Sequence, residues 1–267
     1  MITDDYQGLK YCNGKFKEVQ DTLTAEASIQ IMINKEPWTV TMRTPGNDRE
    51  LVRGLLHNED LFKHPDKKLD YEVIDRDENG DPLTVIVTIP EALLGKSYIN
   101  SRNILSVSSC GICGKRELDD LKVNGKPLPV SEQIDLKTLD DMFLEMRQGQ
   151  KAFQTSGGCH AAAAFNFQGE MLMLMEDIGR HNAVDKVVGA LIEKGNLKDA
   201  RCLLVSGRVS YEIVTKAFMA GIPVLAAVSA TSTLAADFAK ELGITLLAFC
   251  RDGKATCYAN TARLKRN

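Results

Sequence analysis

The sequence predicts an α/β protein, with a mostly parallel sheet in its second half and a smaller β-rich portion before it. In the second half, short and continuously apolar runs alternate with helical patterns at intervals of roughly twenty residues, which is typical of strands joined by crossover helices. In the first part, apolar and polar residues alternate instead, as they do in strands with one buried face. The chain has 267 residues, enough for one large domain or two modest ones.

The β-rich portion is expected to contain a hairpin, one helix and a further strand. Apolar residues alternate over 27–33 and again over 38–42, and the turn sequence NKEP lies between them. Asp48 is the expected start of a helix that continues to about Phe62, with leucines on one face. A strand over 85–89 follows the turn sequence DENGDP.

The second half is expected to contain buried strands and the helices that connect them. The strands are the apolar runs 171–175, 202–205, 223–228 and 244–249. The helices are expected over 184–192, 209–219 and 233–242, each followed closely by a glycine that suits a helix end. A more polar helix is expected over 136–148. The predicted division is a β-rich portion over 1–100, a cysteine-bearing loop region over 101–130 and an α/β domain over 131–267.

Composition and charge argue against several classes of protein. The formal net charge is -3, so the chain lacks the positive charge expected for binding nucleic acid or anionic membranes. No apolar run approaches the roughly 18 residues that span a bilayer, and the first residues do not resemble a secretory signal. We therefore expect a cytoplasmic protein, in which disulfides are rare and paired cysteines more often bind metal or react.

The segment SSCGICGK contains two cysteines, Cys110 and Cys113, separated by two residues. A structural zinc site needs four ligands, and Cys159 and His160, which are adjacent in sequence, would form a poor second pair. A thioredoxin-like redox pair should lie at the start of a helix, and no helical pattern follows Cys113. Two loop cysteines without a role are a third interpretation.

An accessible nucleophile is the interpretation that the local sequence favours. Glycines flank both thiols and would keep them exposed, and the cations of Lys115 and Arg116 would favour the thiolate form. An exposed and activated thiol in a loop suits a residue that receives a group and hands it on. Cys110 and Cys113 are therefore the candidate catalytic residues, with no metal required.

The segment TSGGCHAAAAF is expected to form a glycine turn and then an alanine-rich helix that begins near His160. Exposed N–H groups at such a helix start can hold an anion, and close packing of small residues against a sheet explains the alanines equally well. A zinc deaminase would place a glutamate two residues after the histidine. Ala162 stands there instead, so deamination is not expected.

Three strand-to-helix junctions carry polar residues that suit an anionic ligand. EDIGRHNAVDK follows an apolar run, and Asp185 is expected to orient the imidazole of His181 one helical turn away. In SGRVSYE, hydroxyls, Arg208 and a helix N-terminus suit a phosphate. SATSTLA is a third junction, which a simple helix cap would also explain. Because ligands bind at the carboxyl ends of strands in open α/β sheets, the three together favour a nucleotide-like ligand.

These segments resemble the FdhD family of formate dehydrogenase accessory sulfurtransferases. CGICG, GGCHAAA, EDIGRHNAVDKVVG, SGRVSYEIVTKA and AGIPVLAAVSATSTLA occur in the order seen in that family, over about residues 48–258. The resemblance implies a cytidine-deaminase-like, three-layer α/β/α domain and a homodimer. It also implies that a cysteine desulfurase supplies persulfide sulfur, which this protein passes to the molybdenum bis(molybdopterin guanine dinucleotide) cofactor before the cofactor enters formate dehydrogenase.

The resemblance further implies roles for particular residues. Cys110 would hold the persulfide with Cys113 assisting, and the segment FCRDGK, with its aromatic ring and cations, would form part of the guanine-dinucleotide site. The expected cofactor-binding residues are Phe249, Cys250, Arg251, Asp252, Gly253, Lys254, His181, Asn182, Asp185, Lys186, Ser206, Gly207, Arg208 and Ser229. Two alternatives stay open: a cofactor- or guanine-nucleotide-binding chaperone that moves no sulfur, and a zinc-dependent hydrolase or deaminase.

Overall fold

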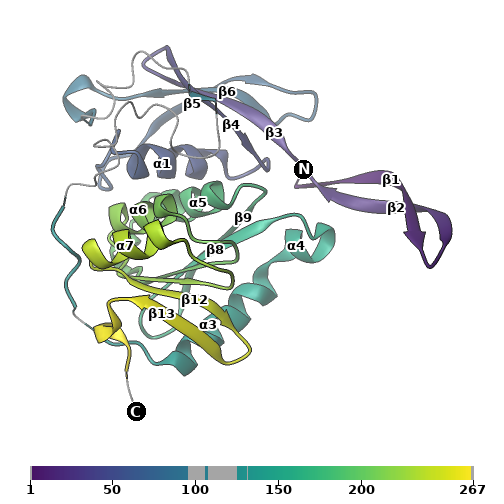
Figure 1. Cartoon of the computed structure of the whole chain (residues 1–267). Helices are drawn as coiled ribbons and strands as arrows, with labels where there is room; N and C mark the ends of the chain where they lie inside the picture. Colours follow the sequence, from purple (N-terminus) through teal and green to yellow (C-terminus); the bar gives the residue numbers. More distant parts are fainter. Residues whose placement is uncertain (1, 96–105, 108–124, 131, 266–267) are drawn as a thin grey trace.

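The structure, a computed structural model, describes residues 2–95, 106–107, 125–130 and 132–265. These residues form a projecting two-stranded arm, a five-stranded sheet and a six-stranded sheet. Figure 1 shows the two larger sheets on opposite sides of the molecule, with a layer of helices between them. No helix in the described part of the chain is long and apolar enough to cross a membrane.

The arm consists of β1 (Thr3–Cys12) and β2 (Lys15–Thr24), which pair antiparallel. Asn13 and Gly14 form its turn with positive φ values, as two-residue hairpin turns require. Figure 1 shows the arm extending away from the rest of the molecule. The sequence does not predict these two strands, because their few apolar side chains do not alternate regularly.

The β-rich portion is a five-stranded sheet with one helix packed on it. In spatial order its strands are β5 (Asp70–Arg76), β6 (Pro82–Thr88), β3 (Ala27–Ile33), β4 (Glu36–Arg43) and β7 (Ser106–Val107). The helix is α1 (Asp48–Asn58), and a 3-10 turn, η1 (Glu91–Leu93), follows β6. The predicted hairpin, helix and later strand are confirmed, although the helix ends at Asn58 and not near Phe62.

Apolar and polar residues alternate along β4, which predicts that its apolar face packs on the core. In the structure the other face of β4 is the buried one. Its pairing with β3 shifts register between Ile31 and Met32, which accommodates an extra residue in β4. Thr41 and Arg43 are therefore buried, whereas Met42 is 42% exposed. Since successive side chains of a strand point to opposite faces, a shift of one residue exchanges the two faces.

The second half forms a mixed six-stranded sheet. In spatial order its strands are β13 (Lys254–Ala259), β12 (Thr245–Arg251), β11 (Val224–Ala227), β10 (Cys202–Val205), β8 (His160–Phe165) and β9 (Met171–Asp177). Only the β10–β11 and β11–β12 pairings are parallel among these strands. The prediction of a mostly parallel sheet is therefore wrong. Short turns connect β8 to β9 and β12 to β13, and such turns can join only antiparallel neighbours.

Helices cover both faces of this sheet. One face packs against α5 (Arg180–Glu193), α6 (Tyr211–Met219) and α7 (Thr233–Glu241), and the other packs against α3 (Leu136–Gly149). These are the helices that the sequence predicts, and α5 begins four residues earlier than expected. The remaining short elements are α4 (Lys151–Ser156), η3 (Leu197–Asp199) and η4 (Thr261–Arg263).

The alanine run after His160 forms β8 and not the predicted helix. β8 lies inside the sheet, between β9 and β10, and residues 161–165 are at most 2% exposed. Ala162 and Ala164 face α5, while Ala163 faces α3. The helix propensity of alanine is a weak preference that tertiary context overrides. Small side chains suit this position because helices pack on both faces of the strand.

Helices α1 and α5 cross in near backbone contact between the two sheets (Figure 1). A Cβ atom on Gly54 of α1 would overlap the main-chain carbonyl of Asp185 in α5, and one on Gly189 would overlap that of Glu50. His57 of α1 also reaches α6, with Nε2 3.0 Å from the carbonyl oxygen of Met219. Burial lowers the pKa of His57 to about 4, so this imidazole is neutral at neutral pH.

Replacing Gly54 with alanine should lower the free energy of unfolding by about 2–3 kcal/mol, because the added methyl group meets main-chain atoms that no side-chain rotation can move. Urea unfolding followed by circular dichroism measures the change. Gly149→Ala in α3 is the matched control, since its added methyl group meets only the flexible end of Leu174. An equal loss in both variants would contradict the close crossing of α1 and α5.

Candidate functional site

The candidate site lies along the edge of the six-stranded sheet at which β9, β10, β11 and β12 end. Parallel pairing places Val205 beside Ala227, and Ala226 beside Leu247. β8 runs antiparallel to its neighbours and begins at the same edge, where His160 pairs with Asp177. With strands about 4.8 Å apart, the edge from β12 to β8 is roughly 14 Å long. The expectation that the three polar junctions share one edge is confirmed.

Two arginines and two histidines gather at the β8–β10 end of this edge. Gly207 allows the loop after β10 to lie against them, since a Cβ there would be 3.2 Å from Nδ1 of His160 and 3.4 Å from Cβ of Arg180. Burial lowers the pKa of His160, and the charges of Arg180, His181 and Arg208 lower it further. We call His160, Arg180, His181 and Arg208 the cation cluster.

Arg180 is the member of the cation cluster whose hydrogen bonds are incomplete. Its Nε atom is buried and has no hydrogen-bond partner among the described residues. A buried donor without a partner is uncommon and destabilising. Arg208, by contrast, is exposed. An anion at this edge would meet one half-buried and one exposed guanidinium group.

His181 is positioned by Glu212 and not by Asp185. Its Nε2 atom lies 3.0 Å from Oε2 of Glu212 and 3.2 Å from the hydroxyl of Ser210, which itself donates to Glu212 at 3.0 Å. Burial opposes ionisation of Glu212, but the hydrogen bonds and charge of His181 outweigh it and lower the pKa of Glu212. The expected pairing of Asp185 with His181 is therefore wrong, because Asp185 is engaged elsewhere.

The helix N-termini at this edge differ in how they are capped. α5 begins after Gly179 and α6 after Ser210, and neither receives a side-chain cap in the described structure, because the Ser210 hydroxyl bonds Glu212. Ser232 does cap α7, accepting from the N–H of Ala235 at 3.2 Å. The SATSTLA junction is thus a helix cap, as the simpler interpretation held. The hydroxyl of Ser206 accepts from the N–H of Ala161 at 2.9 Å.

The segment FCRDGK covers the end of β12, the turn that follows and the first residue of β13. Phe249 has a φ of 57°, which is rare for a bulky residue, and its ring is 40% exposed. Its N–H donates to the carbonyl of Ser229 at 3.1 Å, so both predicted residues lie together at the edge. Strain of this kind concentrates at ligand sites. The other exposed residues of the segment are Arg251, Asp252, Gly253 and Lys254.

Cys250 differs from its neighbours in this segment. It is 2% exposed and packs with the core beneath α3, on the opposite face of the sheet from α5. Burial raises the pKa of its thiol to about 12. Any contact between Cys250 and a ligand at the edge would therefore involve its backbone.

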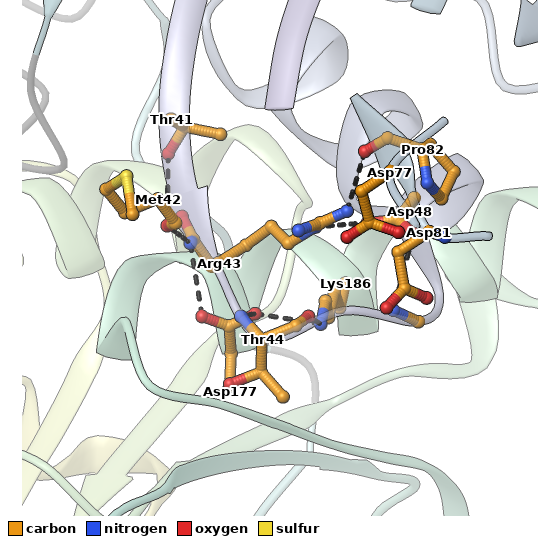
Figure 2. Close-up of polar contacts among 12 residues, drawn as sticks. Thr41, Met42, Arg43, Thr44, Asp48, Asp77, Asp81, Pro82, Asp177 and Lys186 are labelled. Carbon is orange, nitrogen blue, oxygen red and sulfur yellow. Dashed lines mark hydrogen bonds and ion pairs between the residues drawn. The ribbon is translucent and has the colours of Figure 1, made fainter. Parts of the chain in front are cut away.

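The buried residues of EDIGRHNAVDK hold the two sheets together, and Figure 2 shows two of them, Asp177 and Lys186. Asp177 is fully buried, pairs with Nζ of Lys186 at 2.8 Å and accepts from the N–H of Thr44 at 3.1 Å. Lys186 also donates to the carbonyl of Thr44 at 2.8 Å, and Asn182 donates to that of Met42 at 2.7 Å. The end of β4 is thereby fixed to α5.

Asp185 has a similar role between α1 and α6. It accepts from Lys216 at 2.7 Å and from Asn58 at 2.7 Å, and all three side chains are buried. Burial opposes the charge of Lys216, but Asp185 and Glu59 outweigh it and raise the pKa of Lys216. Asn182, Asp185 and Lys186 are thus engaged in internal contacts, and their role in binding a cofactor stays a prediction.

The cysteines divide between the described structure and the rest of the chain. Cys110 and Cys113, the predicted catalytic pair, lie outside the described residues. Cys159 is 4% exposed, and burial raises the pKa of its thiol. Within the described ranges, no group of three or more histidine, cysteine and acidic side chains could hold a metal ion.

Two features of the edge do not follow from the sequence. Glu212 was part of a quoted segment, but nothing in the sequence connects it with His181, which lies 31 positions earlier. His160 was expected at a helix start and is instead the first residue of a strand that brings it to Arg180. A strand assignment for the alanine run would have predicted both the edge and the place of His160.

The geometry is that of a mixed α/β protein whose six-stranded sheet has one edge lined with polar and basic residues, and comparisons with known proteins agree with one family. Residues 24–265 match the FdhD/NarQ family. The chain is 38% identical to the sulfur carrier protein FdhD of Streptomyces avermitilis, over 98% of this chain and 96% of the relative. It is 41% identical to that of Nocardia farcinica, over 92% and 89% respectively. This chain belongs to the FdhD/NarQ family.

A solved structure has the same fold. It is described as a putative formate dehydrogenase accessory protein from Desulfotalea psychrophila, and the two structures agree with a TM-score of 0.77. The match covers 99% of this chain and 100% of the other, at 19% identity.

Replacing Arg208 with glutamine should raise the pKa of His160, because it removes one of the charges that lower that pKa. An NMR titration of the imidazole signals measures the change, and the exposure of Arg208 makes a loss of folding unexpected. Lys198→Gln, in η3 before β10, removes a cation at the other end of the sheet and should leave His160 unchanged. Identical titrations of His160 in the native protein and the Arg208 variant would contradict the cation cluster.

Proposed function

We propose that this protein is a cytoplasmic sulfur carrier. It accepts persulfide sulfur from a cysteine desulfurase and transfers it to the molybdenum bis(molybdopterin guanine dinucleotide) cofactor before formate dehydrogenase receives that cofactor. The observation that carries the proposal is the match, along nearly the whole of both chains, to relatives named as sulfur carrier proteins. The proposed fold type is the cytidine-deaminase-like three-layer domain, which agrees with helices on both faces of the sheet.

The proposed chemistry uses the Cys110 thiolate as the acceptor. It attacks the outer sulfur of the desulfurase persulfide, so that a new S–S bond forms on Cys110 and the donor cysteine leaves as a thiolate. Release of that sulfur as sulfide requires two electrons. The Cys113 thiolate supplies them by attacking the inner sulfur, which leaves a Cys110–Cys113 disulfide for later reduction. This step explains why the CGICG segment contains two thiols and not one.

The sheet edge supports binding of the cofactor as a substrate. Its guanine dinucleotide parts carry diphosphates, which guanidinium groups and uncapped helix N-termini bind well. The cation cluster supplies the guanidinium groups at one end of the edge, and Phe249 presents an exposed ring for base stacking at the other. The roughly 14 Å between them suits a ligand with separated phosphate and base groups.

A second candidate function is a chaperone that binds the cofactor or a guanine nucleotide without moving sulfur. The cation cluster and Phe249 favour it, because the chemistry expected of them, phosphate binding and base stacking, requires no thiol. The two functions differ in one requirement, since the chaperone should work equally well without its thiols.

Incubation with a cysteine desulfurase and cysteine should add one sulfur, about 32 Da, to the native protein and none to Cys110→Ala. Intact-mass spectrometry detects the gain, and treatment with dithiothreitol should remove it. Cys12→Ala is the matched control, because Cys12 is exposed at the tip of the arm and lies outside the proposed site. That variant should gain sulfur as the native protein does.

Three other results would each change the proposal. No gain in the native protein, with an active desulfurase, would exclude sulfur transfer and favour the chaperone. A gain retained in Cys110→Ala but lost in Cys113→Ala would exchange the roles of the two thiols. A gain retained in both variants would assign the sulfur to a cysteine outside the CGICG segment.

A further inference from the structure

β9 is the last strand of the six-stranded sheet, and its outer edge borders a cavity. Among the described strands it pairs with β8 alone. The cavity has a volume of about 370 Å³ and is lined by Leu174, Met175 and Glu176 of β9. Successive side chains of a strand point to opposite faces of its sheet. A cavity that meets three consecutive residues therefore lies beside the edge of the strand and not over one face.

The backbone groups of Leu174 and Glu176 point away from β8, towards this cavity. On the far side of β8, the carbonyl of Ala161 accepts a hydrogen bond from the chain that follows β10. Because bonding directions alternate along an antiparallel strand, the next residue, Ala162, bonds β9, where its partner is Met175. The N–H and C=O groups of Leu174 and Glu176 therefore point outwards, and no hydrogen bond between described residues engages them.

An edge with unpaired N–H and C=O groups is a template for a further strand. Extended peptides bind to such edges through their main chains, while pockets for alternate side chains provide the selectivity. Pro45, Ala152, Leu174 and Met175 supply an apolar lining here, which suits small apolar side chains. The volume is near the lower end of the range for ligand sites, roughly 300–1,000 Å³. The cavity therefore suits the short end of a chain.

Two lysines that line the cavity have donors to spare. Lys186 is buried, and its ammonium group binds the carbonyl of Thr44 at 2.8 Å and the carboxylate of Asp177 at 2.8 Å, as Figure 2 shows. An ammonium group carries three N–H bonds, so one is left for a ligand. Lys151 is exposed and forms no salt bridge with a described residue.

The carboxylates near these lysines already have partners. Both oxygens of Glu176 accept from main-chain N–H groups at the start of α4, at 2.9 and 2.8 Å. Both oxygens of Asp177 also accept from main-chain N–H groups, at 3.1 and 2.8 Å. Lys151 directly precedes the groups that bind Glu176, and Lys186 binds Asp177, so both lysines lie where β9 ends. The unused groups at this end are ammonium donors, which favour an anion.

We propose that the edge of β9 binds the C-terminal segment of a partner protein. The segment adds to the sheet as a further strand, and its main chain bonds Leu174 and Glu176. Its terminal carboxylate meets Lys186 and Lys151, so the segment runs parallel to β9. Its last residues are small and apolar, to match the lining of the cavity. Because β9 ends at the candidate site, the partner is held beside that edge, and binding requires no thiol.

Synthetic hexapeptides test the site. Each carries fluorescein at its N-terminus, and its last three positions vary among alanine, valine and threonine. Every sequence is made with a free carboxyl group and with a C-terminal amide, and fluorescence anisotropy measures the dissociation constants. At least one sequence should bind with a free carboxyl group. Its amide should bind at least about tenfold more weakly, because it lacks the charge that Lys186 and Lys151 meet.

Three variants at exposed positions separate the parts of the site. Lys151→Gln should weaken binding of the free-carboxyl peptide about tenfold and leave its amide unchanged. Lys137→Gln in α3 is the matched control, because this lysine is exposed and does not line the cavity, and it should bind like the native protein. Thr155→Trp places a large ring in the cavity and should abolish binding of both forms.

Hydrogen exchange followed by NMR tests the strand addition. Without peptide, the N–H groups of Leu174 and Glu176 should exchange faster than that of Met175, which bonds β8. Bound peptide should slow the exchange of at least one of the two outward N–H groups about tenfold.

The proposal fails if no peptide of the set binds, if free and amidated forms bind equally, or if binding slows neither outward N–H group. Protection of Leu174 and Glu176 without peptide, increasing with protein concentration, would instead assign the edge to a second copy of the chain.

Discussion

The crossing of α1 and α5 is the constraint on which the rest of the structure depends. Glycines at the crossing let the two backbones touch, and the charges around it are fully buried. Asp177 with Lys186 and Asp185 with Lys216 are ion pairs of this kind. Removing one partner of such a pair leaves an uncompensated buried charge, which typically costs about 3–5 kcal/mol. The β-rich portion and the six-stranded sheet are therefore expected to act as one unit.

The same contact sets the place of the functional side chains. α5 begins at the sheet edge. Some residues just before this helix and in its first turns contact β4, and others belong to the cation cluster. Asp177 and Asn182 face β4, while Arg180 and His181 join the cation cluster at the edge. The buried carboxylate therefore fixes the helix whose first residues carry the positive charge. A substitution in α1 that displaces this helix should also displace the residues at the sheet edge, because α5 cannot move independently of α1.

The sequence predicted the helices and strands whose pattern is set by neighbouring residues alone. The apolar run 202–205 forms β10 with the predicted bounds, because a short and fully apolar segment is stable in few environments other than a buried strand. The alanine run failed because its location between two layers of helices, and not its propensity, decides that it is a strand. The edge residues were predicted from their segments, but their partners were not. Glu212 reaches His181 only because β9 and β10, the strands before α5 and α6, both pair with β8 in the folded sheet.

A urea titration followed by two probes measures whether the two sheets unfold together. Trp38 in β4 is the single tryptophan, and its fluorescence follows the β-rich portion. Far-ultraviolet circular dichroism follows mainly the helices of the second half. The account predicts coincident transitions with one midpoint, as a single cooperative unit requires. A Trp38 transition that is complete before the circular dichroism changes would contradict it.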